Sequence, residues 1–145
     1  MTLVPDESPS IGFLLVRVAE AIDRAFVDAL AELDLKPREL RLLVILDRLG
    51  PLSQRSLANE LAVDPGNLIE ALDRLQARGL LDRPRASDDR RKRLVELTGS
   101  GKRLLRRATA SAVEAEDRIL SVLTPRERAA VHGAMLRVWS SWDRA

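Results

Sequence analysis

Apolar positions recur every three or four residues through most of the chain, which is the period of an amphipathic helix. A first helix is expected from Ser10 to about Leu33. A second should begin at Pro37 and end before Gly50 and Pro51, because proline suits the first turn of a helix and glycine commonly follows the last. The apolar face of the first helix is broad enough to contact more than one surface, and a second subunit is the simplest partner.

The middle of the chain predicts two short helices joined by a tight turn. Ser53 can cap a helix that runs from Gln54 to about Leu61. Asp64 can cap the next helix, with Pro65 as its first residue. Two short strands, at residues 80–83 and 94–97, follow with a polar loop between them.

Helix, turn, helix and hairpin in this order are typical of a winged helix-turn-helix, which holds one helix in the major groove of DNA while the hairpin reaches the neighbouring backbone or minor groove. Two further helices are expected, from about Gly101 to Val122 and from Thr124 onward, where Thr124-Pro125-Arg126-Glu127 is a capping-box pattern. The predicted fold is therefore mainly α, within the α+β class, with a two-stranded wing. Residues 34–98 form the winged helix-turn-helix lobe, and residues 8–33 and 99–145 form flanking helical dimerisation regions of one chain, 1–145.

Charge is distributed unevenly along this chain. The formal net charge is only +2, but residues 74–107 carry 12 basic and 4 acidic side chains, whereas residues 1–73 carry 7 basic and 13 acidic ones. The basic block coincides with the predicted hairpin and its flanks. We therefore interpret it as a polyanion-binding surface rather than a merely solvated face.

The composition argues against several other classes of protein. The chain has no Cys, so we expect no disulfide, no thiol sensor and no thiolate metal site. No apolar run approaches the roughly 18 residues that a membrane span needs, and the acidic N-terminus lacks the basic region of a signal peptide, so a cytoplasmic protein with no membrane partner is expected. His132 is the only histidine, and neither metal-ligand spacing nor a glycine-rich phosphate loop is present. We expect no metal, no cofactor and no enzymatic activity.

The outer face of the fourth predicted helix carries the candidate base contacts, since the N-terminal part of a recognition helix usually meets base edges. Asn67 can pair with adenine, although it could simply finish the capping turn. Glu70 can accept from cytosine, but phosphates repel a carboxylate, so solvation is an equal alternative. Arg74 lies further along and is expected at a phosphate. The predicted DNA-contacting residues are Ser53, Gln54, Arg55, Pro65, Gly66, Asn67, Ile69, Glu70, Arg74, Arg83, Arg85, Asp89, Arg90, Arg91 and Arg93.

Several short motifs follow one another along nearly the whole chain. They are Leu33-x-Leu35-x-Pro37-x-Glu39-Leu40, Leu57-Ala58, Leu72-Asp73-Arg74-Leu75, Gly79-Leu80, and Asp89-Arg90-Arg91 followed by Leu97-Thr98 and Gly101. In this order and spacing they resemble the MarR family of bacterial regulators. The resemblance implies a homodimer whose terminal helices interdigitate, a palindromic double-stranded DNA operator and, often, a small aromatic or phenolic effector that releases DNA. It also implies that Asp89 positions Arg91 and that Arg91 enters the groove.

The chain departs from the family pattern at Lys36, where Thr or Ser is common, and at Gly66 and Asn67, which replace a common Ser-Thr pair. The family's ligand pocket lies between the dimerisation helices and the DNA-binding lobe. Its candidate lining residues here are Phe13, Arg17, Phe26 and Leu43, and for each of them we favour a place in the core.

The predicted function is a sequence-specific, DNA-binding transcriptional regulator, in the form of a homodimeric repressor. The alternative is a winged-helix module that binds a protein, or that binds DNA without sequence preference.

Overall fold

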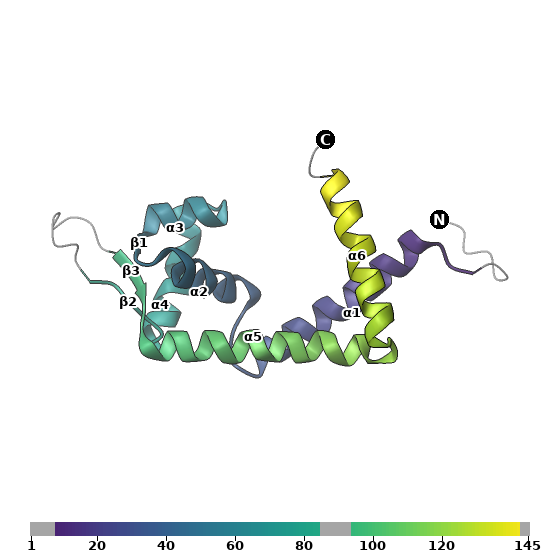
Figure 1. Cartoon of the computed structure of the whole chain (residues 1–145). Coiled ribbons are helices and arrows are strands. Elements are labelled where there is room, and N and C mark those ends of the chain that lie inside the picture. The colour runs from purple at the N-terminus through teal and green to yellow at the C-terminus, as the bar shows by residue number, and fades with distance from the viewer. Residues whose placement is uncertain (1–7, 85–93, 143–145) are drawn as a thin grey trace. The chain divides into compact units, whose positions relative to one another are not determined.

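The computed structural model describes residues 8–84 and 94–142, which are mainly helical as predicted. The helices are α1 (Ile11–Ala31), α2 (Pro37–Leu49), α3 (Gln54–Leu61), α4 (Ile69–Ala77), α5 (Gly99–Ile119) and α6 (Pro125–Trp142) (Figure 1). The strands are β1 (Leu52–Ser53), β2 (Leu81–Asp82) and β3 (Leu94–Leu97), and the 3-10 helices are η1 (Pro65–Leu68) and η2 (Leu120–Val122). No helix among these residues is long and apolar enough to cross a membrane.

The chain divides into two compact units. One is Phe26–Ala112, and the other combines Met1–Ala25 with Val113–Ala145. We call the first the winged-helix lobe and the second the terminal-helix unit. Helices α1 and α5 each contribute to both units.

Most predicted helix ends are confirmed by their hydrogen bonds. The Ser53 hydroxyl accepts from the backbone N–H of Ser56 at 3.1 Å and so caps α3. At the start of α6, the backbone N–H of Thr124 donates to the Glu127 carboxylate at 2.8 Å, and the N–H of Glu127 donates back to the Thr124 hydroxyl at 3.3 Å. This reciprocal pair is the capping box that the sequence predicted.

The predicted two-stranded wing is present as β2 and β3, and β1, which the sequence did not predict, adds a third strand to it. The sheet has three strands in the order β1-β3-β2, and all neighbours are antiparallel. Leu52 pairs with Val95, and Leu81 pairs with Leu97. Strand β1 has only two residues before α3 begins, so it is too short to produce the alternating pattern by which a strand is found.

The fourth helix also starts differently from the prediction. Pro65 begins the 3-10 helix η1, and α4 follows only at Ile69. The backbone N–H of Asn67 donates to the Asp64 carbonyl at 3.0 Å, an i to i+3 bond, and the Asp64 carboxylate accepts from the N–H of Gly66 at 2.8 Å. These two bonds tighten the turn, and a 3-10 helix is the result.

Leucines from the helices and from the sheet form one core in the winged-helix lobe. Fully buried members are Leu30, Leu42, Leu43, Leu57, Leu68, Leu72, Leu75 and Val95. On α4 and η1 these positions are Leu68, Leu72 and Leu75, at helical spacing. The core therefore holds one face of the fourth helix and leaves the opposite face outward.

A close backbone contact explains the motif that runs from Gly79 to Gly101. The Thr98 hydroxyl donates to the carbonyl of Gly79 at 2.6 Å, and the Thr98 N–H donates to the carbonyl of Leu80 at 3.2 Å. A Cβ placed on Gly101 would lie 2.2 Å from the Leu80 carbonyl oxygen. Glycine at position 101 thus lets the first turn of α5 approach the chain that leaves α4.

Candidate nucleic-acid interface

The outward face of η1 and α4 carries the predicted base contacts. Asn67, Glu70 and Ile69 are exposed, and 48% of Ile69 is accessible although it is a large apolar residue. The next positions inward, Leu68 and Leu72, are fully buried. The fold therefore presents polar and apolar groups together along the exposed side of one short helix.

The residues at the start of α3 differ in how free their side chains are. The Ser53 hydroxyl is engaged as the helix cap. The side-chain amide of Gln54 donates to the Pro65 carbonyl at 3.2 Å, which joins α3 to η1. Arg55 is exposed. Of these three predicted contacts, Arg55 has the least occupied side chain.

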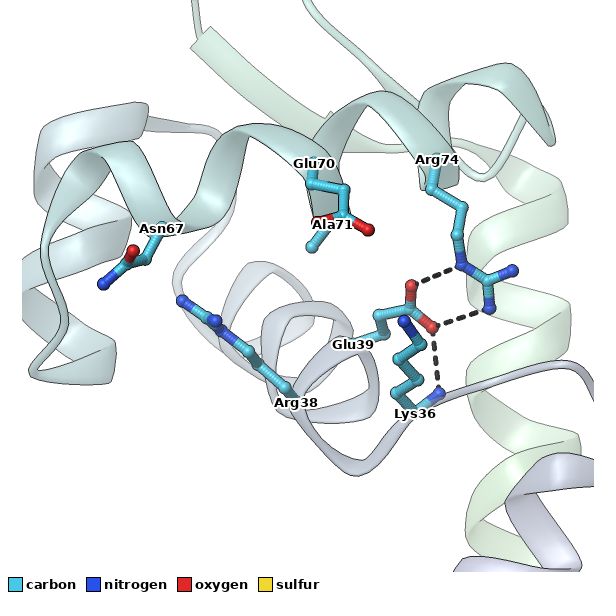
Figure 2. Close-up of a pocket in the computed structure, with 7 residues that line it drawn as sticks. All are labelled: Lys36, Arg38, Glu39, Asn67, Glu70, Ala71 and Arg74. Atoms are coloured by element: carbon cyan, nitrogen blue, oxygen red, sulfur yellow. Dashed lines mark hydrogen bonds and ion pairs between the residues drawn. The ribbon is translucent and has the colours of Figure 1, made fainter.

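A small cleft of about 100 Å³ opens beside the fourth helix. It is lined by Lys36, Arg38, Glu39, Asn67, Glu70, Ala71 and Arg74, and Figure 2 shows these side chains between the start of α2 and α4. Two of the predicted base contacts, Asn67 and Glu70, thus share a cleft with the N-terminal turn of α2.

Arg74 is held by two carboxylates of the lobe. Its Nε donates to Glu39 at 2.8 Å and its Nη2 donates to the same carboxylate at 3.1 Å (Figure 2). The guanidinium also donates to both Asp34 carboxylate oxygens at 3.1 Å and to the Asp34 carbonyl at 2.7 Å. Sequence reasoning placed Arg74 at a phosphate. In the structure all three of its nitrogens are engaged inside the lobe, so we assign Arg74 to positioning α4.

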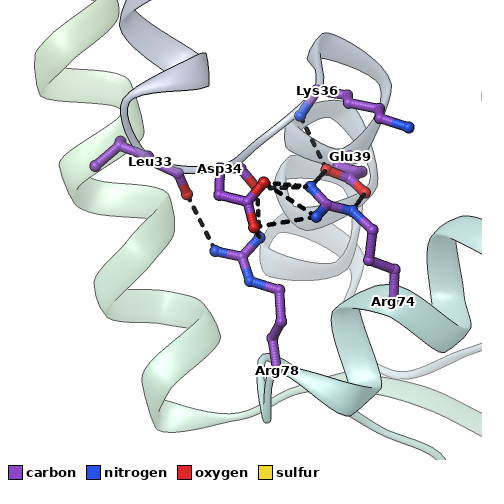
Figure 3. Close-up of polar contacts among 6 residues, drawn as sticks. All are labelled: Leu33, Asp34, Lys36, Glu39, Arg74 and Arg78. Carbon is purple, nitrogen blue, oxygen red and sulfur yellow. Dashed lines mark hydrogen bonds and ion pairs between the residues drawn. The ribbon is translucent and has the colours of Figure 1, made fainter.

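Arg78, one turn further along, binds the same loop. Its guanidinium donates to the carbonyls of Asp34 and Leu33, the second at 3.0 Å, and it lies 3.8 Å from the Asp34 carboxylate (Figure 3). Asp34 has a φ of 51°, in the left-handed region. The turn that follows α1 is therefore stabilised by two arginines, Arg74 within α4 and Arg78 at the C-cap of that helix.

Glu39 is the most buried charged group described in the lobe, with 2% of its side chain accessible. Burial alone would raise the pKa of Glu39. The hydrogen bonds from Arg74 and from the Lys36 backbone N–H, together with the charges of Arg74 and Lys36, outweigh burial and hold that pKa below its usual value. Conversely, the Glu39 hydrogen bond and the Asp34 contacts raise the pKa of Arg74. Both groups of this pair are charged at neutral pH.

Arg83, predicted to contact DNA, also has partners inside the lobe. Its guanidinium bonds to the Asp73 carboxylate and to the side-chain oxygen of Gln76, both on α4. These bonds tie the end of β2 to the fourth helix. The remaining predicted wing residues, Arg85, Asp89, Arg90, Arg91 and Arg93, lie outside the described residues.

The four residues predicted to line a ligand pocket have different environments. Leu43 is fully buried in the core and Phe26 packs against that core. For these two residues the structure agrees with the core placement that we favoured. Phe13 is half-buried. The core place favoured for Arg17 is wrong, because Arg17 is exposed and pairs with Glu20 at 2.6 Å. Phe13 and Arg17 belong to the terminal-helix unit, whereas Phe26 and Leu43 belong to the winged-helix lobe.

Sequence reasoning missed the role of Glu39, although a signal was present. Leu35, Glu39, Leu42 and Leu46 follow one another at spacings of four, three and four, the rhythm of a buried helix face. A carboxylate on such a face must find a cationic partner, because an unpaired buried charge is costly. The sequence could therefore have predicted that Glu39 has a partner, but not that Arg74 is the partner.

Comparisons with known proteins agree with this geometry. The family model described as "MarR family" matches residues 35–92. The HTH-type transcriptional regulator PecS of Dickeya dadantii is 33% identical over 127 residues, covering 86% of this chain and 76% of PecS. The HTH-type transcriptional repressor Rv2887 of Mycobacterium tuberculosis is 32% identical over 124 residues, covering 85% and 88%.

Solved structures give the same result. The structure of Rv2887 in complex with DNA superposes with a TM-score of 0.73 at 27% identity, covering 90% of this chain and 98% of that one. Wild-type MarR from E. coli in its apo form has a TM-score of 0.76 at 25% identity, covering 92% and 98%. The motifs, the winged-helix lobe and these relatives together show that the chain belongs to the MarR family.

Proposed function

We propose that the protein is a homodimeric transcriptional repressor that binds a palindromic operator in double-stranded DNA. The observation that carries the proposal is the two-sided fourth helix: Leu68 and Leu72 fix its inner face in the core, while Asn67, Ile69 and Glu70 stay exposed. This is the arrangement that a recognition helix needs in a major groove. The Rv2887 repressor, a relative of the same fold, has been solved with DNA, which supports the proposal.

The dimer is proposed from apolar surface in the terminal-helix unit. Large apolar side chains that are more than one-third exposed there include Ile11, Leu14, Leu15, Val18, Val131, Val138, Trp139 and Trp142. Trp139 and Trp142 are 65% and 76% accessible in the single chain. Apolar surface gathered in this way marks an interaction site, and a second copy that presents the same helices is the partner we propose.

Competition binding tests the proposal directly. The full-length protein is expected to prefer the promoter adjoining its own gene over random duplex by about a thousandfold or more. Selection from a random pool should return an inverted repeat with half-site centres about 10 bp apart, or a close multiple, because two symmetric recognition helices must enter successive major grooves. Equal affinity for every duplex would instead support the non-specific winged-helix module.

Asn67→Ala sharpens this test at one base pair. Preference at a single position of each half-site, most simply an adenine, should relax, while preference elsewhere stays the same. Asn59→Ala is the matched control, because Asn59 is an exposed asparagine on α3 and does not line the cleft. Unchanged preference in the Asn67 variant would show that the recognition helix is placed wrongly.

The wing contact is proposed from the family resemblance, in which Asp89 positions Arg91 in the groove. Arg91→Ala should weaken operator binding by about 1–3 kcal/mol with little change in thermal stability. Arg118→Ala removes the same charge from an exposed position of α5 in the terminal-helix unit and is the control. Equal effects of the two substitutions would contradict the wing contact.

Release of DNA by a small aromatic or phenolic effector is likewise proposed from the resemblance. Leu43 is fully buried, so a ligand could touch it only after the core opened. Phe26, which is half-buried and packs against the core of the winged-helix lobe, is the candidate apolar contact that we test. Titration of the operator complex with salicylate, as a probe phenol, should lower the DNA affinity of the native chain. If the Phe26→Ala variant keeps its DNA affinity in the same titration, the result supports a site at Phe26.

A further inference from the structure

Most cations that border the fourth helix are already used inside the lobe. Arg74 and Arg78 bind Asp34, Glu39 and the turn after α1, and Arg83 binds Asp73. These are the charges that the sequence assigned to DNA or placed in the basic block. A helix that enters a DNA groove needs cations beside it that are free to meet phosphates, because phosphate contacts supply most of the affinity and fix the register.

Lys36 and Arg38 are two cations beside the fourth helix whose side chains are not used in this way. Both are exposed, and within residues 8–84 and 94–142 neither side chain has an ion-pair or hydrogen-bond partner. The Lys36 contact with Glu39 is made by its backbone N–H, at 2.9 Å. The Lys36 charge contributes only to the lowered pKa of Glu39.

Their position is set by the cleft beside the recognition helix. Lys36 and Arg38 line the same cleft as Asn67 and Glu70, and Figure 2 shows Arg38 extending from α2 on the side of the cleft that carries Asn67. If Asn67 meets a base edge, the sugar-phosphate backbone that borders the groove must pass beside the helix that carries it. The first turn of α2 lies beside that helix.

The charges of the cleft fit a polyanion. Its lining includes three cations and two carboxylates. Arg74 and Glu39 neutralise each other through their paired hydrogen bonds. The other charged residues of the lining are the cations Lys36 and Arg38 and the carboxylate Glu70. Two free cations offset the repulsion that a single Glu70 would exert on phosphates.

We propose that Lys36, the N-cap of α2, and Arg38, in its first turn, form a phosphate-binding pair that contacts the DNA backbone beside the recognition helix. The pair adds affinity and fixes how far the recognition helix enters the groove, and it reads no base. This inference rests on the proposed function, since it assigns a further part of the same DNA interface.

The salt dependence of operator binding tests the pair. Affinity of full-length protein for its selected operator is measured from 50 to 200 mM salt for the native chain and for the double variant Lys36→Gln, Arg38→Gln. Each phosphate contact contributes about 0.9 to the slope of log affinity against log salt, so a symmetric dimer should lose about 3 to 4 units of slope. The advantage of the native chain should therefore shrink about a hundredfold over this range.

The control is the double variant Arg118→Gln, Arg126→Gln, which removes the same charge from exposed positions of α5 and α6 in the terminal-helix unit, outside both the cleft and the basic block. A slope change in the α2 variant that is no larger than the change in the control would overturn the inference. An altered base preference would also overturn it, because the pair would then contact bases. Unchanged thermal unfolding of the α2 variant excludes a folding defect, and it is expected because neither side chain has a hydrogen-bond or ion-pair partner among the described residues. If the native chain itself prefers no duplex, it is the proposed function that fails.

Discussion

The two units of this chain differ in how far their apolar residues are buried. In the winged-helix lobe, leucines from α2, α3 and α4 are fully buried in one core. In the terminal-helix unit the only described residue in the buried class is Ala115, and twelve of the sixteen exposed large apolar residues lie there. The lobe thus buries its apolar residues within one chain, whereas the terminal helices expose apolar surface of the kind that marks an interaction site, which is why we propose a second copy as the partner.

The largest predicted loss of stability comes from a substitution in the core of the winged-helix lobe. Leu72→Ala should lower the free energy of unfolding by about 2–5 kcal/mol, because a fully buried leucine leaves a cavity on the inner face of α4. Thermal unfolding should show this loss at every protein concentration.

Leu15→Ala, on α1 in the terminal-helix unit, is the matched comparison, since 44% of Leu15 is accessible in the single chain. Its effect on the melting temperature should depend on protein concentration, because the loss falls on dimer association. A concentration-independent loss equal to that of Leu72→Ala would contradict the contrast between the two units.

The second prediction concerns the buried ion pair that fixes the fourth helix. Glu39→Gln should destabilise the lobe by about 1–3 kcal/mol, since a charge-assisted pair of hydrogen bonds to Arg74 is weakened while Asp34 still holds that arginine. Glu70→Gln is the control, because Glu70 is exposed on α4, the helix that carries Arg74, and should change stability by less than about 0.5 kcal/mol. Equal losses would show that Arg74 does not depend on Glu39.

Acid should reveal the same pair. The pKa of Glu39 is lowered in the folded chain, so its contribution to stability is complete above the unfolded pKa of about 4.3 and is lost as the pH falls through the lower folded value. The difference in unfolding free energy between the native chain and Glu39→Gln should therefore narrow below about pH 4. A difference that stays constant in acid would count against an ionised Glu39.

The ends of the helices and strands show most clearly what could be predicted from the sequence. The caps at Ser53 and Thr124 were predictable because a cap is decided by a few neighbouring residues. Strand β1 was not, since Leu52 and Ser53 become a strand only through pairing with Val95 and Leu94, more than forty residues away.

The candidate site shows the same division. That Asn67 and Glu70 would be exposed followed from the helical period alone. The roles of Arg74 and Arg83 did not, because both residues belong to a basic block whose charges look equivalent in sequence. Which arginine is free depends on the carboxylates that the fold brings near, such as Glu39, thirty-five positions before Arg74. Lys36 and Arg38 were overlooked for the converse reason, since they lie outside that block.

A smaller effect is expected at Gly101 in the lobe. Gly101→Ala should cost about 1–3 kcal/mol, because the new methyl group would lie 2.2 Å from the Leu80 carbonyl oxygen, a backbone atom that cannot turn aside. Gly99→Ala, in the same turn of α5, meets only the end of the flexible Arg103 side chain at 3.5 Å and is the control. Chemical denaturation of both variants measures the difference, and equal stability would mean that α5 can move away without cost.

The smallest predicted effect is a gain in the terminal-helix unit. Gly133 lies within α6, and a Cβ there would meet only the Arg137 side chain, at 3.8 Å. Gly133→Ala should therefore stabilise the helix by about 0.5–1 kcal/mol, because alanine loses less backbone entropy than glycine when a helix forms.

On the helix Gly133 also faces away from Val131, Met135, Val138 and Trp142, which repeat at spacings of four, three and four and form the apolar stripe proposed for the dimer. Sedimentation of the variant should still give a dimer. A loss of stability together with dissociation would place a partner helix against Gly133 and would move the interface to the other side of α6.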